Sequence, residues 1–210
     1  MFVRNMMIPK DRCHVVTGKD SLTSVLEKLD QAKVDGFPVL DGNNYIGIIT
    51  RFCIYESYFY TNMPKELFLK TKKAKDVAIR HETVLQENEV FERTLIRFQY
   101  LPLLAVMDEN KKFLGIVTRS DVMEEFQSVF GTRRSGIRIA FTALEVEGRI
   151  TRLAAIIQKF HESVISLVTF DGTDTLMRRI VLKIEQTKNL KPFITELERN
   201  GFRILAIDKV

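Results

Sequence analysis

The sequence has few of the residues that carry metal or redox chemistry. It contains two cysteines, Cys13 and Cys53, whose spacing matches no metal site and no redox motif. Both are expected to be buried thiols in a reducing cytoplasm. The three histidines, His14, His81 and His161, each stand apart from cysteines and carboxylates at metal-ligand spacing. We therefore expect no metal site and no catalytic histidine.

Long apolar runs and catalytic motifs are also missing. No apolar segment approaches the roughly 20 residues that span a bilayer, and the N-terminal residues lack the pattern of a secretory signal. The sequence has no Gly-x-Ser-x-Gly elbow, no P-loop and no Gly-x-Gly-x-x-Gly turn. Because nothing assembles a nucleophile with a base, we expect a cytoplasmic protein that is not an enzyme.

The excess of positive charge is small and dispersed. The net charge is +5, and the densest basic run, residues 70–75, holds four lysines. A nucleic-acid interface would gather such residues on one face. We favour a solvent-exposed helix end over a nucleic-acid site for this run.

A seven-residue phrase occurs twice. Residues 45–51 read Tyr-Ile-Gly-Ile-Ile-Thr-Arg and residues 113–119 read Phe-Leu-Gly-Ile-Val-Thr-Arg, an offset of 68 positions. Such self-similarity indicates an internal structural repeat. The copies differ just downstream, where Asp121 in the second corresponds to Cys53 in the first.

Each copy sits in the same predicted order of elements, β-α-β-β-α. An extended segment precedes an amphipathic helix that Asp20-Ser21 can cap in the first copy. A strand, a polar turn and the phrase then form a hairpin, and a helix closes the unit. The expected segments are 13–17, 22–29, 37–40, 45–50 and 52–60 in the first repeat, and 82–85, 90–98, 103–107, 113–118 and 121–129 in the second.

The pattern changes after residues 131–136, which hold two glycines and no apolar residue and are predicted to be a linker. Strand and helix periodicities then follow in the order βαββαβ, the ferredoxin-like arrangement. One face of its sheet would be covered by two helices and the other left to a partner or to solvent. The expected segments are strand 137–141, helix 150–160, strands 164–170 and 176–184 around a turn at 171–174, helix 189–199 and strand 202–207.

The repeated unit resembles the cystathionine β-synthase (CBS) motif, and two in tandem resemble a Bateman module. The match is carried by Phe37-Pro38-Val39-Leu40-Asp41 and Gly47-Ile48-Ile49-Thr50, and by the run from Gly115 to Val122. The C-terminal part looks like an ACT domain with a degenerate ligand loop at residues 145–148. The order of the parts is similar to the AcuB-like (acetoin-utilisation B) bacterial proteins.

The fold class implied is α+β, with two CBS repeats forming a pseudo-symmetric pair and a ferredoxin-like ACT-like domain. The expected boundaries are 1–70 for the first repeat and 71–130 for the second. The linker would span 131–136 and the ACT-like domain 137–210.

The Thr-x-x-Asp turn of the second repeat suits a ribonucleotide. Gly115 would let the backbone approach a ligand closely, and Thr118 offers a hydroxyl. Asp121, in the first helical turn, accepts hydrogen bonds as a vicinal diol requires, and Arg119 would favour a phosphate. The alternative is that Thr118 and Asp121 merely cap the helix.

The resemblance implies two clefts, each built from both repeats. Cys53 stands where the second cleft needs a carboxylate, so that cleft would bind a ribonucleotide weakly or not at all. The first cleft would use Thr118, Arg119, Asp121, Ile116, Ile8, Pro9, Val34, Asp35, Gly36 and Phe37, and the second Thr50, Ile79, Arg80, Gln99 and Tyr100.

Two further features allow two interpretations each. An aromatic stretch between the repeats could stack bases, but packing in the core of the pair or a dimer interface is favoured. The loop with Glu145 and Gly148 could bind an amino-acid ammonium or serve only in oligomerisation. The aromatic residues are Phe52, Tyr55, Tyr58, Phe59, Tyr60 and Phe68.

The expected function is a homodimeric regulatory protein without a resident cofactor. The CBS pair would bind an adenine nucleotide such as AMP, ATP or cyclic di-AMP and bias the ACT-like domain or an unknown protein target. No membrane partner is expected. The alternative is an amino-acid sensor in which the ACT-like half binds the ligand and the CBS pair is scaffold.

Overall fold

The computed structural model describes residues 2–79, 82–98, 100–171 and 176–210. The chain divides into two compact units, Met1–Met123 and Glu124–Val210, and each is described by itself. No helix in the described ranges is long and apolar enough to cross a membrane.

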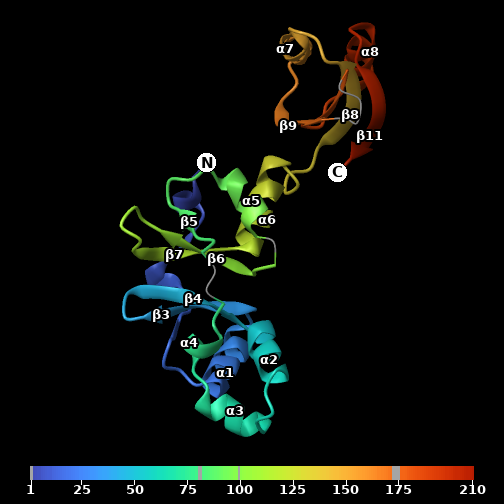
Figure 1. Cartoon of the computed structure of the whole chain (residues 1–210). Helices are drawn as coiled ribbons and strands as arrows, with labels where there is room; N and C mark the ends of the chain where they lie inside the picture. The colour runs from blue at the N-terminus through green and yellow to red at the C-terminus, as the bar shows by residue number, and fades with distance from the viewer. Residues whose placement is uncertain (1, 80–81, 99, 172–175) are drawn as a thin grey trace. The chain divides into compact units, whose positions relative to one another are not determined.

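The N-terminal unit contains the two predicted repeats, and both have the predicted element order (Figure 1). The first comprises β2 (Val16–Thr17), α1 (Leu22–Ala32), β3 (Gly36–Asp41), β4 (Asn44–Thr50) and α2 (Arg51–Phe59). The second comprises β5 (Leu85–Gln86), η3 (Phe91–Arg93), α5 (Thr94–Arg97), β6 (Leu103–Met107), β7 (Phe113–Thr118) and α6 (Arg119–Val129). The segments between and before them are η1 (Val3–Asn5), β1 (Ile8–Pro9), η2 (Lys10–Arg12), α3 (Lys65–Thr71) and α4 (Ala74–Val77).

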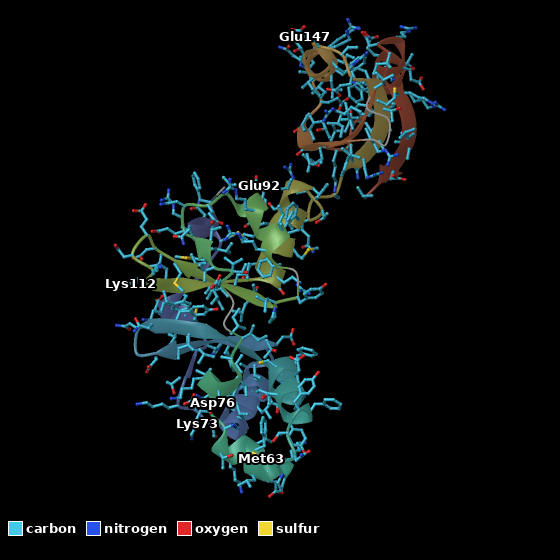
Figure 2. The ribbon with its side chains drawn as sticks, viewed as in Figure 1. Met63, Lys73, Asp76, Glu92, Lys112 and Glu147 are labelled. Carbon is cyan, nitrogen blue, oxygen red and sulfur yellow. The ribbon has the colours of Figure 1, made fainter. Side chains whose placement is uncertain are left out.

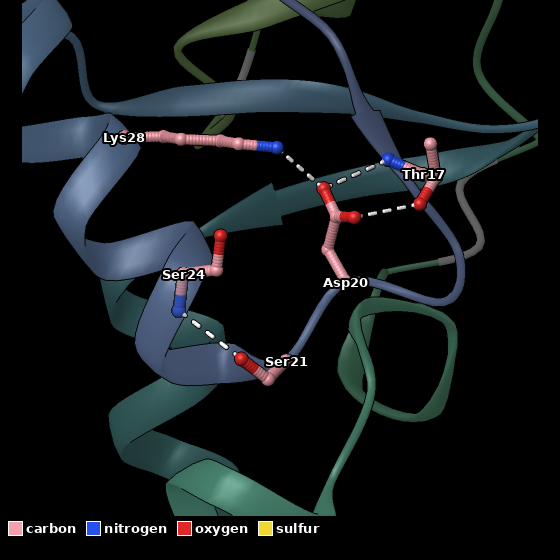
Figure 3. A network of polar contacts seen from close by, with 5 residues as sticks. All are labelled: Thr17, Asp20, Ser21, Ser24 and Lys28. Carbon is pink, nitrogen blue, oxygen red and sulfur yellow. Dashed lines mark hydrogen bonds and ion pairs between the residues drawn. The ribbon is translucent and has the colours of Figure 1, made fainter.

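The start of α1 is fixed by the polar residues that the sequence predicts there (Figure 3). Ser21 is the N-cap, and its hydroxyl accepts from the Ser24 amide at 3.3 Å. Asp20 accepts from Thr17 and from the Lys28 ammonium, the latter at 2.6 Å. Burial alone would raise the pKa of Asp20, but the bonds from Lys28 and Thr17 outweigh it and lower that pKa below its usual value.

The opening segments of the two repeats exchange partners. β1 pairs antiparallel with β7 of the second repeat, with Ile8 opposite Ile116 and Pro9 opposite Gly115. Ile79, in the opening segment of the second repeat, exchanges both backbone hydrogen bonds with Ile48 on β4 of the first. The two sheets of the unit therefore have the orders β2-β3-β4 and β1-β7-β6-β5.

This exchange corrects the role predicted for Gly115. A Cβ at this position would lie 2.2 Å from the Ile8 carbonyl oxygen, far inside contact distance. The missing side chain therefore admits the backbone of β1 and not a ligand.

The two copies of the repeated phrase meet where the sheets face each other. Tyr45 and Phe113 begin their copies at equivalent positions, and their rings stack at 5.9 Å with an interplanar angle of 4°. The Tyr45 hydroxyl is buried without a hydrogen-bond partner among the described residues, and burial raises the pKa of this phenol. The two equivalent positions therefore differ by one buried polar atom, the Tyr45 hydroxyl, which has no counterpart on Phe113.

The helix predicted over 90–98 is shorter in the structure. Only η3 and the single turn α5 form. Leu95 of the predicted apolar stripe is 49% exposed, and the adjacent Ile96 is 78% exposed. The basic run falls at the end of α3 and in α4, where the Asp76 carboxylate accepts from the Lys73 amide at 2.9 Å (Figure 2). Lys70, Lys72 and Lys75 are exposed there.

The C-terminal unit has the predicted βαββαβ order. Its sheet order is β11-β8-β10-β9 with antiparallel pairs throughout, which is the ferredoxin-like arrangement. α7 and α8 pack on one face, over a core that includes Phe141, Leu182 and Phe193 (Figure 1). The elements are β8 (Ile137–Leu144), α7 (Arg149–Lys159), β9 (Val164–Asp171), β10 (Met177–Ile184), α8 (Leu190–Arg199) and β11 (Arg203–Lys209). The turn predicted at 171–174 lies mostly outside the described residues.

The segment 131–136 is hydrogen-bonded into the C-terminal unit. The buried Lys183 ammonium donates to the Gly131 carbonyl at 2.9 Å, and the Ser166 hydroxyl donates to the Phe130 carbonyl. Gly136 and Val210 exchange both of their backbone hydrogen bonds. The role of this segment as a linker stays a prediction, but its backbone is held at both ends.

Candidate functional site

The partner exchange brings three distant segments of the N-terminal unit around one cavity of about 260 Å³. The first wall is β1 with the residues that follow it, 8–14. The second is the segment 33–37, which leads into β3, and the third is β7 with the start of α6. The lining residues are Ile8, Arg12, Cys13, His14, Lys33, Val34, Asp35, Gly36, Phe37, Pro102, Leu103, Ile116, Thr118 and Ser120.

The turn between β7 and α6 is closed by reciprocal hydrogen bonds. Asp121 Oδ2 accepts from the Thr118 amide at 2.8 Å and from the Thr118 hydroxyl at 2.7 Å, and the Asp121 amide donates to Thr118 Oγ1 at 3.1 Å. Asp121 therefore caps the helix, as in the interpretation that the sequence offered as the alternative to nucleotide contact. Its other carboxylate oxygen, Oδ1, makes no hydrogen bond with the described residues and remains able to accept.

The equivalent turn of the first repeat has the same geometry with a thiol. The Thr50 amide donates to Cys53 Sγ at 3.0 Å, and the Cys53 amide donates to Thr50 Oγ1 at 3.2 Å. The thiol proton is directed to the Thr50 carbonyl at 3.1 Å. Cys53 is 4% exposed and has no spare acceptor comparable to a carboxylate oxygen.

This pair of repeats, with exchanged opening segments and matching strand–helix turns, can be compared with known families. The family model described as "CBS domain" matches residues 3–58 and again residues 74–128, more than half of the chain. The chain belongs to the CBS-domain family.

Solved structures with this CBS pair include proteins crystallised with nucleotides. CBSX2 in complex with AMP is 25% identical, with a TM-score of 0.50 over 63% of this chain and 98% of that chain. The CbpB protein of Listeria monocytogenes in complex with c-di-AMP is also 25% identical, with a TM-score of 0.52 over 60% and 94%. A CBS domain-containing protein of unknown function from Bacillus anthracis, 23% identical with a TM-score of 0.54 over 60% and 93%, shows the shared fold.

Seven of the ten residues predicted for the first CBS cleft line the cavity. They are Ile8, Val34, Asp35, Gly36, Phe37, Ile116 and Thr118. Pro9 lies in β1 opposite Gly115, and Asp121 is not among the lining residues but is hydrogen-bonded to Thr118, which is. The Arg119 guanidinium donates to the carbonyls of Phe98 and Leu101 and so closes the preceding loop; the prediction that it is directed at a phosphate does not fit this geometry.

Sequence reasoning missed several residues of this cleft. Arg12, His14 and Lys33 add cationic or titratable groups to its wall, and Ser120 adds a hydroxyl. Burial raises the pKa of the Cys13 thiol to about 11, so near neutral pH it remains protonated and donates to the Ile8 carbonyl at 3.2 Å. The signal that could have found this wall is the position of residues 10–14, directly after a segment assigned to the cleft.

The second cleft of the CBS pair is a cavity of about 630 Å³. Of the residues predicted for it, Thr50, Ile79 and Tyr100 line it, whereas Arg80 and Gln99 lie outside the described residues. Arg97 also lines it, but its guanidinium is engaged by the Val84 carbonyl and by Glu89. The further lining residues are Phe52, Thr83, Ile96 and Leu101.

The aromatic stretch is divided between core and surface. Tyr58 packs against the buried Phe68 at 5.4 Å between ring centres. The other four aromatic residues are not in the core of the pair; Phe52, Tyr55, Phe59 and Tyr60 are 68%, 51%, 80% and 80% exposed. Core packing is thus wrong for these four, and Phe52 is at the second cleft.

The loop predicted as an ACT ligand site lies between β8 and α7. Glu145 forms an ion pair with Arg178 on β10, and Gly148, with φ +77°, precedes the first turn of α7. No group of three or more His, Cys, Asp and Glu side chains suited to a metal ion exists among the described residues.

Proposed function

We propose that this CBS-domain protein is a non-catalytic regulatory sensor that binds one adenine nucleotide in the cleft beside Asp121. The observation that carries the proposal is the convergence of β1, the segment 33–37 and the β7–α6 turn on one cavity. Two proteins that share the fold at 25% identity are described as complexes with AMP and with c-di-AMP, which supports an adenine nucleotide as the ligand class.

The chemistry of the cleft suits the parts of such a ligand. Ile8, Phe37 and Ile116 provide apolar walls for a base. The Thr118 hydroxyl already donates to Asp121, so at this position it accepts from a ligand hydroxyl more readily than it donates to a phosphate. A ribose diol therefore fits Thr118 Oγ1 together with Asp121 Oδ1, and Arg12 and Lys33 supply cations for phosphates.

Removing the spare acceptor of Asp121 tests this assignment. We expect Asp121→Asn to keep the cap, because its side-chain oxygen still accepts from the Thr118 amide, but to weaken nucleotide binding about tenfold, a loss of roughly 1.4 kcal/mol. Titration calorimetry with AMP, ATP and cyclic di-AMP measures the change. Asp121→Ala should weaken binding at least as much and also lose about 1 kcal/mol of helix capping.

Cys53 provides the matched control in the other repeat. Cys53→Ala alters the equivalent cap without touching the first cleft, so the affinity of that cleft should not change. Nucleotide affinity that is unaltered in Asp121→Asn, or equally weakened in Cys53→Ala, would remove Asp121 from the site. An absence of binding by any of the three nucleotides to the unmodified chain would contradict the proposed function itself.

We also propose that the C-terminal unit receives the signal. Helix α6 starts at the Thr118–Asp121 turn, and the backbone just after its end is bound by Ser166 and Lys183 in the C-terminal sheet. A nucleotide that rearranges the turn would act on a helix that continues into that unit. Differential affinity for two arrangements of the turn is then sufficient to bias the C-terminal unit, for which we retain the ACT-like assignment and the similarity to AcuB-like proteins as proposals.

The amino-acid sensor remains the alternative, with Glu145 and Gly148 as its ligand loop. An amino-acid ligand would need the Glu145 carboxylate for its ammonium group, but this carboxylate already forms an ion pair with Arg178. This contact favours the nucleotide sensor. A thermal-shift screen separates the two, because a ligand that binds only the folded state raises its stability. Stabilisation by amino acids without stabilisation by nucleotides would favour the amino-acid sensor over the nucleotide sensor.

We propose a homodimer whose contact includes the exposed aromatic side chains of α2 and its end. Exposed aromatic clusters of this kind mark protein interfaces. Phe59→Ser combined with Tyr60→Ser should raise the dimer dissociation constant at least tenfold in sedimentation velocity. Ile96→Ser, an equally exposed apolar residue near the second cleft, serves as the control, and an unmodified chain that is monomeric at all accessible concentrations would contradict the proposal.

A further inference from the structure

The face of the C-terminal sheet opposite α7 and α8 carries a row of side chains that the proposed function does not use. Arg179 on β10 lies opposite Phe170 on β9 and opposite Thr142 on β8, and Thr142 in turn lies opposite Arg203 on β11. The neighbouring positions Ile180 and Phe141 are fully buried under the helices. Because successive side chains of a strand point to opposite faces, the row Phe170–Arg179–Thr142–Arg203 lies on the open face.

The two arginines of this row differ from the other arginines of the sheet. Arg138 pairs with its cross-strand neighbour Asp208 at 2.9 Å, and Arg178 pairs with Glu145. Arg179 and Arg203 are exposed, and neither has a hydrogen bond or ion pair with any residue that the structure describes. The row therefore holds two positive charges, with Thr142 between them, and no described carboxylate.

The adjacent row provides an apolar floor. It consists of Val168, Val181, Ala140 and Ala206, which the strand pairing places side by side. The edge beyond β10 is aromatic, because the Phe170 ring stacks against Phe130 at 6.3 Å with an interplanar angle of 18°. The open face thus joins a cationic row, an apolar row and an aromatic edge.

We propose that this face binds a small phosphate monoester whose apolar or aromatic body lies on the half-buried Val168 and Val181, beside Phe170. Arg179 and Arg203 stand two strands apart, about 10 Å between their backbones, so both side chains can reach an anion placed above Thr142. A phosphate monoester has three terminal oxygens, which match the donors of the two guanidiniums and the Thr142 hydroxyl. A carboxylate carries a single negative charge, whereas a phosphate monoester carries about −1.5 to −2 near neutral pH, so two guanidiniums hold the carboxylate less strongly. A second copy of the same face is disfavoured because it would bring four arginines together.

Phenyl phosphate is the probe that combines this anion with an aromatic body. In titrations of the full chain followed by residue-resolved NMR, we expect saturable shifts of the Thr142, Arg179 and Arg203 amides. The apparent Kd should rise at least tenfold in Arg179→Gln and in Arg203→Gln. It should stay unchanged in Arg152→Gln. This substitution also removes one positive charge, but from an exposed position on α7, which lies on the opposite side of the sheet. Benzoate should bind more weakly than phenyl phosphate.

Three results would overturn the proposal. They are the absence of saturable shifts at the three amides, an equal loss of affinity in Arg152→Gln, and benzoate binding as tight as that of phenyl phosphate. The readout is independent of the nucleotide cleft, because shifts at Thr118 or Ile116 report that cleft separately. Both arginine variants replace exposed side chains, so a matching circular dichroism spectrum confirms that the fold is retained.

Discussion

Gly115→Ala is expected to destabilise the N-terminal unit by about 3 kcal/mol, the upper end of the cost of overpacking. The added methyl group would lie 2.2 Å from the Ile8 carbonyl oxygen. This neighbour is backbone and cannot turn aside, so β1 must separate from β7. The pairing of Ile8 with Ile116 would then be lost, and with it one wall of the nucleotide cleft.

Tyrosine fluorescence can measure the stability of the N-terminal unit separately. All five tyrosines lie in the N-terminal unit and the chain has no tryptophan, so tyrosine fluorescence during urea unfolding reports on that unit alone. Gly42→Ala is the control. Its φ is +60° but nothing lies within 4 Å of its Cβ, so it should cost only about 1–2 kcal/mol. Equal destabilisation by the two substitutions would show that the β1 contact is not the cause.

Tyr45→Phe is expected to stabilise the same unit by about 1–3 kcal/mol, the cost of a buried polar group without a partner. The ring would keep its stacking on Phe113, and the hydroxyl that lacks a partner among the described residues would be removed. Thermal unfolding of the full chain, followed by tyrosine fluorescence from the remaining four residues, should show a higher midpoint, by roughly 4 °C per kcal/mol.

Tyr55→Phe separates this effect from a general preference for phenylalanine. Tyr55 is 51% exposed, so its hydroxyl is hydrated and its removal should change stability by less than about 0.5 kcal/mol. Destabilisation by Tyr45→Phe would mean that the hydroxyl has a partner, such as a bound water, that stabilises the folded state.

Most of the fold could be predicted because its signals are local. The strands that contain Pro38 and Ala105 are continuous apolar runs followed by polar turns. Ser21 has a hydroxyl that suits the N-cap position, where the structure places it. The duplicated phrase predicts the pair. The helix over 90–98 could not be limited to its true length, because Phe91, Leu95 and Phe98 have helical spacing although Leu95 is left 49% exposed.

The exchange of β1 has no signal in the local sequence and follows only from the CBS resemblance, which places Ile8 and Pro9 in the cleft of the second repeat. A strand of two residues such as Ile8–Pro9 has no periodicity, and its partner is set by the space above Gly115 in the other repeat. The same reason hides Arg12, whose place depends on which sheet the N-terminal segment joins. Lys33 directly precedes Val34, a residue predicted for the cleft. The direction of a long side chain is equally non-local, as Arg119 shows by bonding to the carbonyl groups of Phe98 and Leu101.

Each opening segment belongs to one repeat by its position in the sequence and to the sheet of the other repeat by its hydrogen bonds. A deletion of residues 2–9 would leave the sheet β2-β3-β4 of the first repeat intact and would expose the edge of β7 in the second. Removal of Ile79 would act in the opposite direction, on β4. If the effect of each truncation were assigned to the repeat that is nearest in sequence, it would be assigned to the wrong sheet. For the same reason, neither repeat could be excised as an autonomous piece.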